Sequence, residues 1–329
     1  MSLKINKEIL ISVEQVSRYY GDACAVNDIS FSVHRGEVLG FLGPNGAGKS
    51  TTMQMICGVL SASTGKITVA GHDMYESPKA AKKHIGFLPE QPPLYQDLNV
   101  DEYLCYAGLL RGIGKTELKK AVAYSKERCG LTETGKRLIK NLSKGFQQRV
   151  GVAQAIIHSP AVVILDEPTS GLDPNQILEI RELISELGND HSVILSTHIL
   201  PEVQSVCDRV LIINQGKLVL DERLDNLQQD DQITPIKIAF RQPPALDILA
   251  NVEGIMDIEQ IGNHHFKIYC ESEITTLNRI TNLAVSSDWQ LYEMIPEKDS
   301  LEETFIQLTR GVSQPLTNIK PDKNEDESL

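Results

Sequence analysis

Two hydrophobic patterns run through the first part of the 329-residue chain. Continuous apolar runs at residues 161–165 and 192–196 are typical of central parallel strands that are buried on both faces. The segment "GEVLGFL", which ends at Leu42, also has strand character, and "TTMQMICGVL" after it has the spacing of a helix. Residues 101–140 carry the short apolar stripes of amphipathic helices. These patterns together predict an α/β fold.

The pattern changes after about residue 228, where "QQDDQITP" forms a polar break. Four strand-like segments follow: "IKIAFR", "IMDIEQI", "HFKIYCE" and "WQLYEMI". Helix-like stretches at 244–251 and 274–286 give the order β-α-β-β-α-β, which predicts a small α+β domain of ferredoxin-like topology over residues 229–312. We expect its last helix to be capped by Asp299 or Ser300, and residues 313–329 to form a disordered tail.

Composition narrows the class of protein. A hydrophobic fraction of 41% allows a sizeable core, and the net charge of −12 with no Lys/Arg-rich block argues against a nucleic-acid-binding module. The six cysteines lack CxxC or metal-site spacing, which favours reduced thiols in a cytosolic protein. No apolar run approaches the ~18–20 residues of a membrane span. Because no signal peptide is evident either, we expect any membrane attachment to come through a partner.

The strongest chemical signal is "GPNGAGKST", which fits G-x-x-x-x-G-K-[ST] between a strand and a helix. Its backbone N–H groups would surround phosphate oxygens, with Lys49 on the β- and γ-phosphates and Ser50 on Mg²⁺. A glycine-rich turn matching by chance is the alternative, and the strand–loop–helix context disfavours it. The predicted nucleotide-binding residues are Gly43, Pro44, Asn45, Gly46, Ala47, Gly48, Lys49, Ser50 and Thr51.

Two further polar positions follow the buried apolar runs. Asp166 ends the run at 161–165, where we expect it to hold Mg²⁺ through water, and Glu167 is the candidate general base for an attacking water. His198 follows the run at 192–196, and we expect it to contact Glu167 and the γ-phosphate. An ordinary acidic pair and a structural histidine are the alternatives.

With these motifs in this order, residues 8–228 resemble the ATP-binding subunit of ATP-binding cassette (ABC) transporters. The resemblance implies a P-loop NTPase fold with a mixed sheet core and a helical subdomain at about residues 92–158. It also implies that Tyr20 stacks on adenine, with Tyr19 as the alternative register. "SGLD" at 170–173 matches the D-loop of the family, which adds Asp173 to the nucleotide-binding residues.

"LSKGF" at 142–146 matches the family signature "LSGGQ". In the family, the signature of one subunit caps the ATP bound by another, which implies that Ser143 and Gly145 bind the γ-phosphate across a dimer. The chain departs from the signature at Lys144 and Phe146. Lys144 either adds positive charge near the phosphates or points to solvent, and a plain N-capped helix is the alternative for the whole segment.

A third departure concerns the loop that usually carries a glutamine near the γ-phosphate. Counting back from Leu94 and Tyr95, the register of that glutamine falls on Glu90, and Gln91 is one place off. We therefore expect Glu90 to contact the nucleotide and Mg²⁺ or its water.

The resemblance implies an ATPase that dimerises, as a homodimer or heterodimer, around two ATP molecules with Mg²⁺. The ending "SLEETFIQLT" resembles the drug-export, sodium-export and gliding-motility branches. We therefore expect it at the cytoplasmic face of the cell membrane, bound to a separately encoded permease and not to nucleic acid. A soluble ABC ATPase that clamps a ribosome or DNA is the rival, but soluble relatives carry two cassettes or a long coiled coil. A phosphotransferase is a third possibility, disfavoured because no acceptor pocket is evident.

Overall fold

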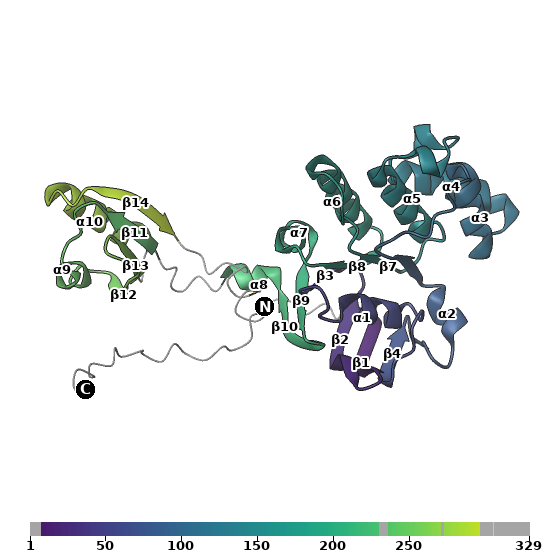
Figure 1. Cartoon of the computed structure of the whole chain (residues 1–329), viewed down its shortest axis with the longest axis horizontal. Coiled ribbons are helices and arrows are strands. Elements are labelled where there is room, and N and C mark those ends of the chain that lie inside the picture. Colours follow the sequence, from purple (N-terminus) through teal and green to yellow (C-terminus); the bar gives the residue numbers. More distant parts are fainter. Residues whose placement is uncertain (1–7, 230–235, 271–272, 297–304, 306–329) are drawn as a thin grey trace, which may run out of the picture.

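The computed structural model describes residues 8–229, 236–270, 273–296 and 305 (Figure 1). We call residues 8–229 the large domain and residues 236–296 the small domain. The large domain contains two sheets, an antiparallel one with the order β2-β1-β4-β5 and a mixed one with the order β10-β9-β3-β8-β7-β6. The antiparallel sheet was not anticipated as a separate layer. Its strands are β1 (Ile9–Tyr20), β2 (Ala23–His34), β4 (Thr64–Val69) and β5 (His72–Asp73).

The larger sheet contains both parallel and antiparallel strands, as the resemblance implied. Strands β9, β3, β8, β7 and β6 are parallel, and β10 is antiparallel to β9. The two predicted apolar runs lie side by side in it as β7 and β8. The strands are β3 (Val38–Leu42), β6 (Ile85–Leu88), β7 (Val162–Asp166), β8 (Ser192–Thr197), β9 (Arg209–Asn214) and β10 (Lys217–Arg223). Because the central strands are parallel, their carboxyl ends meet at one edge of the sheet.

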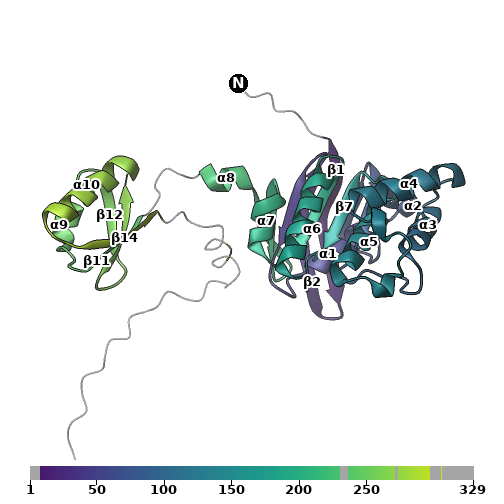
Figure 2. The same ribbon diagram turned by 90° about the horizontal axis from the view of Figure 1, so that it is seen from above.

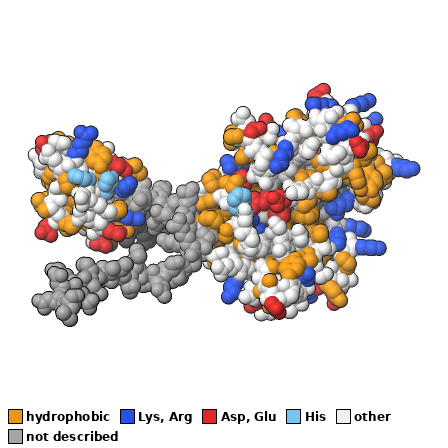
Figure 3. Space-filling model, viewed as in Figure 1, with side chains coloured by type: hydrophobic (Ala, Val, Ile, Leu, Met, Phe, Trp, Pro, Cys, Tyr) orange, Lys and Arg blue, Asp and Glu red, His pale blue; other side chains and the backbone are white. Residues whose placement is uncertain are grey.

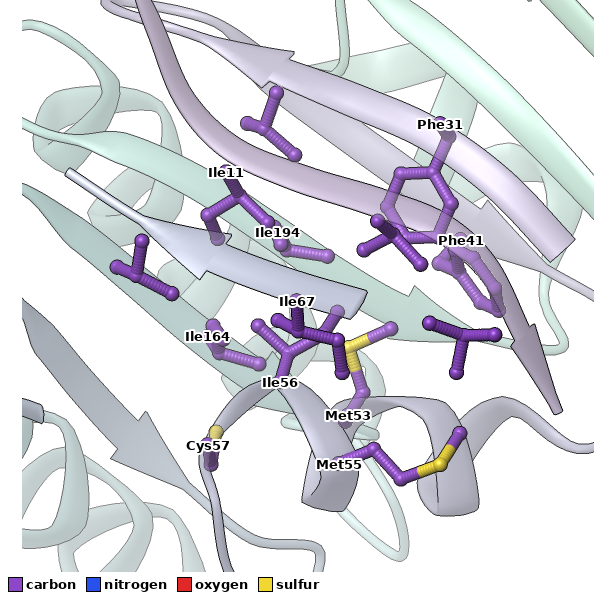
Figure 4. Close-up of a cluster of buried hydrophobic side chains, with 14 of the residues drawn as sticks. Ile11, Phe31, Phe41, Met53, Met55, Ile56, Cys57, Ile67, Ile164 and Ile194 are labelled. Atoms are coloured by element: carbon purple, nitrogen blue, oxygen red, sulfur yellow. The ribbon is translucent and has the colours of Figure 1, made fainter. Parts of the chain in front are cut away.

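Helix α1 (Lys49–Ile56) packs between the two sheets (Figure 4). Its Met53 and Ile56 meet Ile67 from the antiparallel sheet and Ile164 from the mixed sheet in one buried cluster. The helix ends earlier than the apolar spacing suggested. Gly58, in the left-handed conformation, donates to Met55 O, and the next N–H bonds to Gln54 O. These two bonds are the Schellman motif that terminates many helices.

The opposite face of the mixed sheet is covered by helices. Alternate strand residues such as Val163 and Val193 point into a second cluster with them, which explains why the runs are continuously apolar. The helices of this cluster are α3 (Val100–Leu110), α4 (Lys115–Arg128), α5 (Lys144–Ile156) and α6 (Pro174–Gly188). Elsewhere in the domain are α2 (Pro78–Lys82), α7 (Leu200–Val206), α8 (Leu224–Gln229) and 3₁₀ turns at Thr132–Thr134 and Ile139–Asn141. Helix α8 ends at Gln229, the second residue of the polar segment "QQDDQITP".

The small domain has the predicted topology. Its sheet has the order β12-β13-β11-β14 with antiparallel pairs throughout, and α9 and α10 lie on one face of it (Figure 2). The order of elements is β11 (Ile236–Phe240), α9 (Leu246–Ala250), β12 (Ile255–Gln260), β13 (His265–Cys270), α10 (Glu273–Ser286) and β14 (Leu291–Pro296). This is the split βαβ arrangement of ferredoxin-like domains. The predicted last helix and tail lie outside the described residues, apart from Phe305, which packs beside Leu200 and Val203.

None of the six cysteines, all of which are described, forms a disulfide; Cys24 is exposed, while Cys57, Cys129 and Cys270 are buried. Among the described residues, no helix is both long enough and apolar enough to cross a membrane.

Candidate active site

The phosphate loop joins the end of β3 to the start of α1 at one edge of the mixed sheet. Gly48 has a φ of 108°, and a Cβ there would lie 2.6 Å from Ala25 O, so the position requires glycine. Gly48 is also the N-cap of α1 and supplies no side chain to cap it. The first N–H groups of α1 therefore keep their hydrogen-bonding capacity at the positive end of the helix dipole, which suits a phosphate.

Lys49 reaches from α1 back across this loop. Its ammonium group donates to Gly43 O at 2.8 Å and to Pro44 O at 3.3 Å, and the side chain is buried. It also lies 3.3 Å from Glu167 Oε1. The backbone carbonyls of the loop thus hold a buried positive charge directly beside the candidate general base.

Ser50 and Asp166 bring together the two metal ligands that the sequence predicted. Ser50 Oγ donates to Asp166 Oδ1 at 3.2 Å across the end of β7. Burial raises the pKa of Asp166; the nearby hydroxyl groups of Ser196 and Ser50 oppose the shift, and the carboxylates of Glu167 and Glu90 add to it. A hydroxyl and a carboxylate among further carboxylates form the hard oxygen set that Mg²⁺ prefers, so these residues fit that ion.

Glu167 follows β7 in a backbone conformation that is rare for a residue with a side chain. Its φ is 48°, and its N–H donates to Ser196 O on β8 at 2.9 Å. The side chain is 6% exposed. Its Oε1 has the distance of an ion pair to Lys49 but not the alignment of a hydrogen bond, so this buried oxygen is left without a hydrogen-bond donor. Such an oxygen can accept a proton from water.

His198 contacts Glu167 from the end of β8. Its Nδ1 lies 2.9 Å from Glu167 Oε2. Because a carboxylate accepts hydrogen bonds, Nδ1 carries the proton in this pair and Nε2 is left to face outward. The predicted contact between His198 and Glu167 is therefore present in the structure.

Lys49, Ser50, Glu167 and His198 line one cavity of about 400 Å³ at the carboxyl edge of the sheet, whereas Asp166 is not among its lining residues. Glu90 lines it as well, and it also lines a neighbouring cavity beside Lys144 and Gln147, where Gln91 lies. The lining residues are Ala25, Asn45, Gly46, Gly48, Lys49, Ser50, Thr51, Glu90, Glu167, Ser170 and His198. Of the two neighbours in that loop, Glu90 is therefore the one that borders the phosphate loop.

Comparison with known proteins agrees with this geometry. The family model described as "ABC transporter" matches residues 26–170. The bacitracin transport ATP-binding protein BcrA of Bacillus licheniformis is 32% identical over 304 residues, which cover 92% of this chain and 98% of BcrA. The chain belongs to the family of ABC transporter ATP-binding proteins.

Two further comparisons support the same assignment. The linearmycin resistance ATP-binding protein LnrL of Bacillus subtilis (strain 168) is 40% identical over 213 residues, which cover 64% of this chain and 68% of LnrL. A solved structure titled "Structure of ATP binding subunit of ABC transporter" superposes with a TM-score of 0.61 at 30% identity, covering 67% of this chain and 92% of that one. The chain is thus an ABC ATPase, and its large domain has the P-loop fold of that family.

The predicted adenine contact lies outside the cavity of this ABC ATPase. Tyr20 is 49% exposed at the end of β1, and the guanidinium of Arg18 stacks over its ring at 4.7 Å. Tyr19 is similarly exposed, but its ring has no such cation among the described residues. Arg18 thus covers one face of the Tyr20 ring, and the contact of this ring with adenine stays a prediction.

The signature residues also lie outside the cavity. Ser143 is the N-cap of α5 and accepts from Phe146 N at 3.4 Å, and a Cβ on Gly145 would collide with Gln176 of α6. Lys144 is exposed, and its ammonium lies directly over Gly171, where a side chain would otherwise sit. Within one chain, Lys144 is therefore exposed, as one of the two alternatives expected, and its ammonium lies beside the D-loop.

Asp173 differs in position from the other predicted nucleotide-binding residues. It is the N-cap of α6, where its Oδ1 accepts from Asn175 N at 3.1 Å and Gln176 N at 3.0 Å. It does not line the cavity within one chain, and its proposed contact with a nucleotide stays a prediction.

Sequence reasoning missed three buried residues behind the site: Thr169, Thr197 and Glu202. Each is at most 3% exposed, and both hydroxyl groups donate to the Glu202 carboxylate. In the sequence, only the positions of the two threonines pointed to a role at the site: Thr169 follows Glu167 by two residues, and Thr197 directly precedes His198.

Proposed function

We propose that this ABC ATPase hydrolyses ATP in a dimer that holds two ATP molecules between its subunits, and that it drives export through a separately encoded permease. The observation that carries the proposal is the position of Glu167. This residue contacts both Lys49 and His198 at the edge of the phosphate-loop cavity. A carboxylate with one buried, unbonded oxygen at this point supports the role of general base.

Each residue has a distinct task in this proposal. Lys49 and the N–H groups at the start of α1 bind the phosphates, and Glu167 takes a proton from the attacking water. His198, which donates to Glu167 through Nδ1, fixes that carboxylate and presents its other ring nitrogen to the γ-phosphate. Mg²⁺ held by Ser50 and Asp166, with Glu90 nearby, would neutralise charge on the β- and γ-phosphates.

A second subunit supplies the part of the site that one chain lacks. Ser143, Gly145 and Asp173 do not line their own chain's cavity. The N-terminus of α5 has no acidic residue in its first turn and carries Lys144, so it presents positive potential for a phosphate. We assign these residues to the ATP bound by the partner subunit.

Export is supported by the relatives named for bacitracin transport and linearmycin resistance. A permease also has a surface to bind, because apolar side chains remain exposed near Glu90 and along α3, including Tyr95, Tyr106 and Leu110 (Figure 3). We place the protein at the cytoplasmic face of the membrane, held there by the permease. The net charge of −12 supports a protein partner rather than a nucleic acid.

Mixing two inactive variants tests the shared site. Ser143→Arg blocks the signature without touching its own phosphate loop, and Lys49→Ala does the reverse. Each variant alone should lack ATPase activity, but a mixture should recover some, because one site of a mixed dimer is intact. Ser286→Arg, at an exposed serine of the small domain, is the control and should stay active. If mixed dimers form, as shown by pull-down of differently tagged chains, and no activity returns, the shared site is wrong.

Cofractionation tests the permease. The protein should sediment with membranes only when the permease encoded beside it is coexpressed, and Tyr106→Asp should release it. Sedimentation with ribosomes or DNA instead would favour the rival function, an ABC ATPase that clamps a ribosome or DNA.

A further inference from the structure

Glu202 is a buried carboxylate that the proposed chemistry does not use. It lies in the first turn of α7 and is 1% exposed. Its Oε1 accepts from Thr169 Oγ1 at 2.6 Å, and its Oε2 accepts from Thr197 Oγ1 at 2.6 Å. No ion pair among the residues that the structure describes includes Glu202. Two neutral hydroxyl groups are therefore its side-chain partners.

The two donors come from the two loops that carry the proposed catalytic pair. Thr169 lies two residues after Glu167, and Thr197 lies directly before His198. The backbone of Thr197 also accepts from Gly43 N, at the start of the phosphate loop, at 3.4 Å. The Glu202 side chain thus bonds to the loops after β7 and β8, and the second of these loops bonds to the phosphate loop through its backbone.

The loop after β7 needs such an anchor. Glu167 has a φ of 48°, a conformation that persists only when surrounding contacts hold it. The turn that follows is closed by Ser170 N to Glu167 O at 3.1 Å and Leu172 N to Thr169 O at 3.1 Å. Thr169 is buried in this turn, and its hydroxyl donates to Glu202.

A role in packing alone does not explain a carboxylate at this position. Buried charge without a cation contributes little to stability, and an apolar residue beside Leu200 and Val203 would fill the space as well. Only a carboxylate accepts from both hydroxyl groups at once, since a glutamine amide offers one oxygen and one N–H₂ group. Hydrogen bonds to a charged acceptor are also short and directional, which fixes the positions of both threonines.

We propose that Glu202 is a positioning residue for hydrolysis, which holds the loops of Glu167 and His198 at the spacing that lets these two residues meet. This inference rests on the proposed roles of Glu167 and His198. It predicts that Glu202 affects the rate of the chemical step and not the affinity for ATP, because Lys49 and the phosphate loop remain in place.

Steady-state kinetics of the full-length chain tests this. Glu202→Gln and Glu202→Ala should lower kcat by about ten- to a hundredfold with KM for ATP changed less than about threefold. Glu37→Gln is the matched control, because Glu37 is also a buried carboxylate of the large domain but lies at the opposite edge of the sheet. It should lower thermal stability while leaving the kcat of the folded protein unchanged.

Combined variants separate positioning from a general loss of structure. In a Glu167→Gln background, adding Glu202→Ala should cause little further loss of rate, because the residue being positioned is already disabled. Amide hydrogen exchange gives a readout that does not depend on activity. Exchange at Ser170, Leu172 and Ile199 should speed up in Glu202→Ala, because their N–H groups bond to Glu167 O, Thr169 O and Thr197 Oγ1.

The outcomes are distinguishable. The first outcome is that Glu167→Gln stops hydrolysis while both Glu202 variants keep a normal kcat, as Glu37→Gln should. In that case the positioning role is wrong and the proposed function stands. If Glu167→Gln itself hydrolyses ATP normally, the proposed function fails first.

Discussion

The two edges of the mixed sheet both bury charged side chains, but they use them differently. At the amino edge, before β3 and β9, Glu37 accepts from His34 N and Arg209, and Asp208 accepts from Val38 N. His158 and His191 at the same edge lie within hydrogen-bond distance of the carbonyl oxygens of Ile85 and Pro160. These carboxylates and imidazole rings therefore pair with backbone groups at the ends of the strands.

At the carboxyl edge, the charged groups face one another and a cavity. Lys49, Glu167 and His198 form a chain of contacts, and Glu167 Oε1 lacks a hydrogen bond although it is buried. A buried oxygen in this condition costs stability. At the amino edge, the carboxylates of Glu37 and Asp208 are hydrogen-bonded, although His158 Nδ1 and His191 Nε2 are also buried without a partner. The comparison separates two kinds of carboxylate: those of Glu37 and Asp208 are bonded to the backbone, whereas that of Glu167 keeps one buried oxygen open beside the cavity.

The largest expected effect tests the amino edge. Arg209→Ala leaves the buried carboxylate of Glu37 without its cation and should lower the free energy of unfolding by about 3–5 kcal/mol. Urea denaturation measures it. Arg35→Ala, which removes an exposed ion pair with Glu8, should change little. ATP affinity of the folded Arg209→Ala protein should match the wild type, and weaker binding would show that the edges are not separate.

Lys49→Ala makes the opposite test at the carboxyl edge. It removes the buried charge that should face the β- and γ-phosphates, so the free energy of ATP binding should become less favourable by about 2–5 kcal/mol. Titration with a fluorescent ATP analogue measures the change, and Lys66→Ala, at an exposed lysine of β4, is the control. Wild-type affinity in Lys49→Ala would move the phosphate site elsewhere.

His158 gives the amino edge a dependence on pH. Burial, aided by the charge of Arg111, lowers the pKa of His158 to about 4. The folded protein therefore keeps this ring neutral while the unfolded chain protonates it below about pH 6.5, so stability falls as pH drops from 6.5 towards 4. After allowance for solvent screening, the loss should be about 1–3 kcal/mol. The difference between wild type and His158→Gln in urea denaturation at each pH isolates it; parallel curves would contradict it.

The smallest expected effect concerns the contact with the adenine base of ATP. Tyr20→Ala should weaken ATP binding by ~1–3 kcal/mol, as base stacking on an aromatic ring does, with little change in the preference for ATP over GTP. Equilibrium binding of both nucleotides measures it. Tyr19→Ala is the matched comparison: a loss there and none at Tyr20 would shift the stacking residue by one position.

Much of the site could be predicted because its determinants are local. The phosphate loop, Asp166, Glu167 and His198 each follow a strand that the apolar pattern reveals, and parallel strands bring such ends together. The ferredoxin-like order of the small domain follows from alternation in the same way. The end of α1 was missed, because the apolar spacing continues past Gly58, where a Schellman motif closes the helix.

Other features depend on contacts between distant segments. Glu202 reads as a charged residue in a short helix, and only the fold places it between Thr169 and Thr197. Lys144 could not be assigned either, because its contact with Gly171 requires α5 and the D-loop to lie side by side. The separate antiparallel sheet depends on long-range pairing of β1 with β4.

The central claim is that Glu167 is the base and that ATP joins two subunits. Glu167→Gln keeps the size of the side chain but removes the proton acceptor, so phosphate release should fall by about 10²–10⁴-fold. ATP binding should survive, and the variant should elute as a dimer with ATP and as a monomer with ADP in size-exclusion chromatography. Glu186→Gln, at an exposed glutamate of α6, should behave as the wild type. Near-normal hydrolysis by Glu167→Gln, or a dimer that ignores the nucleotide, would contradict the account.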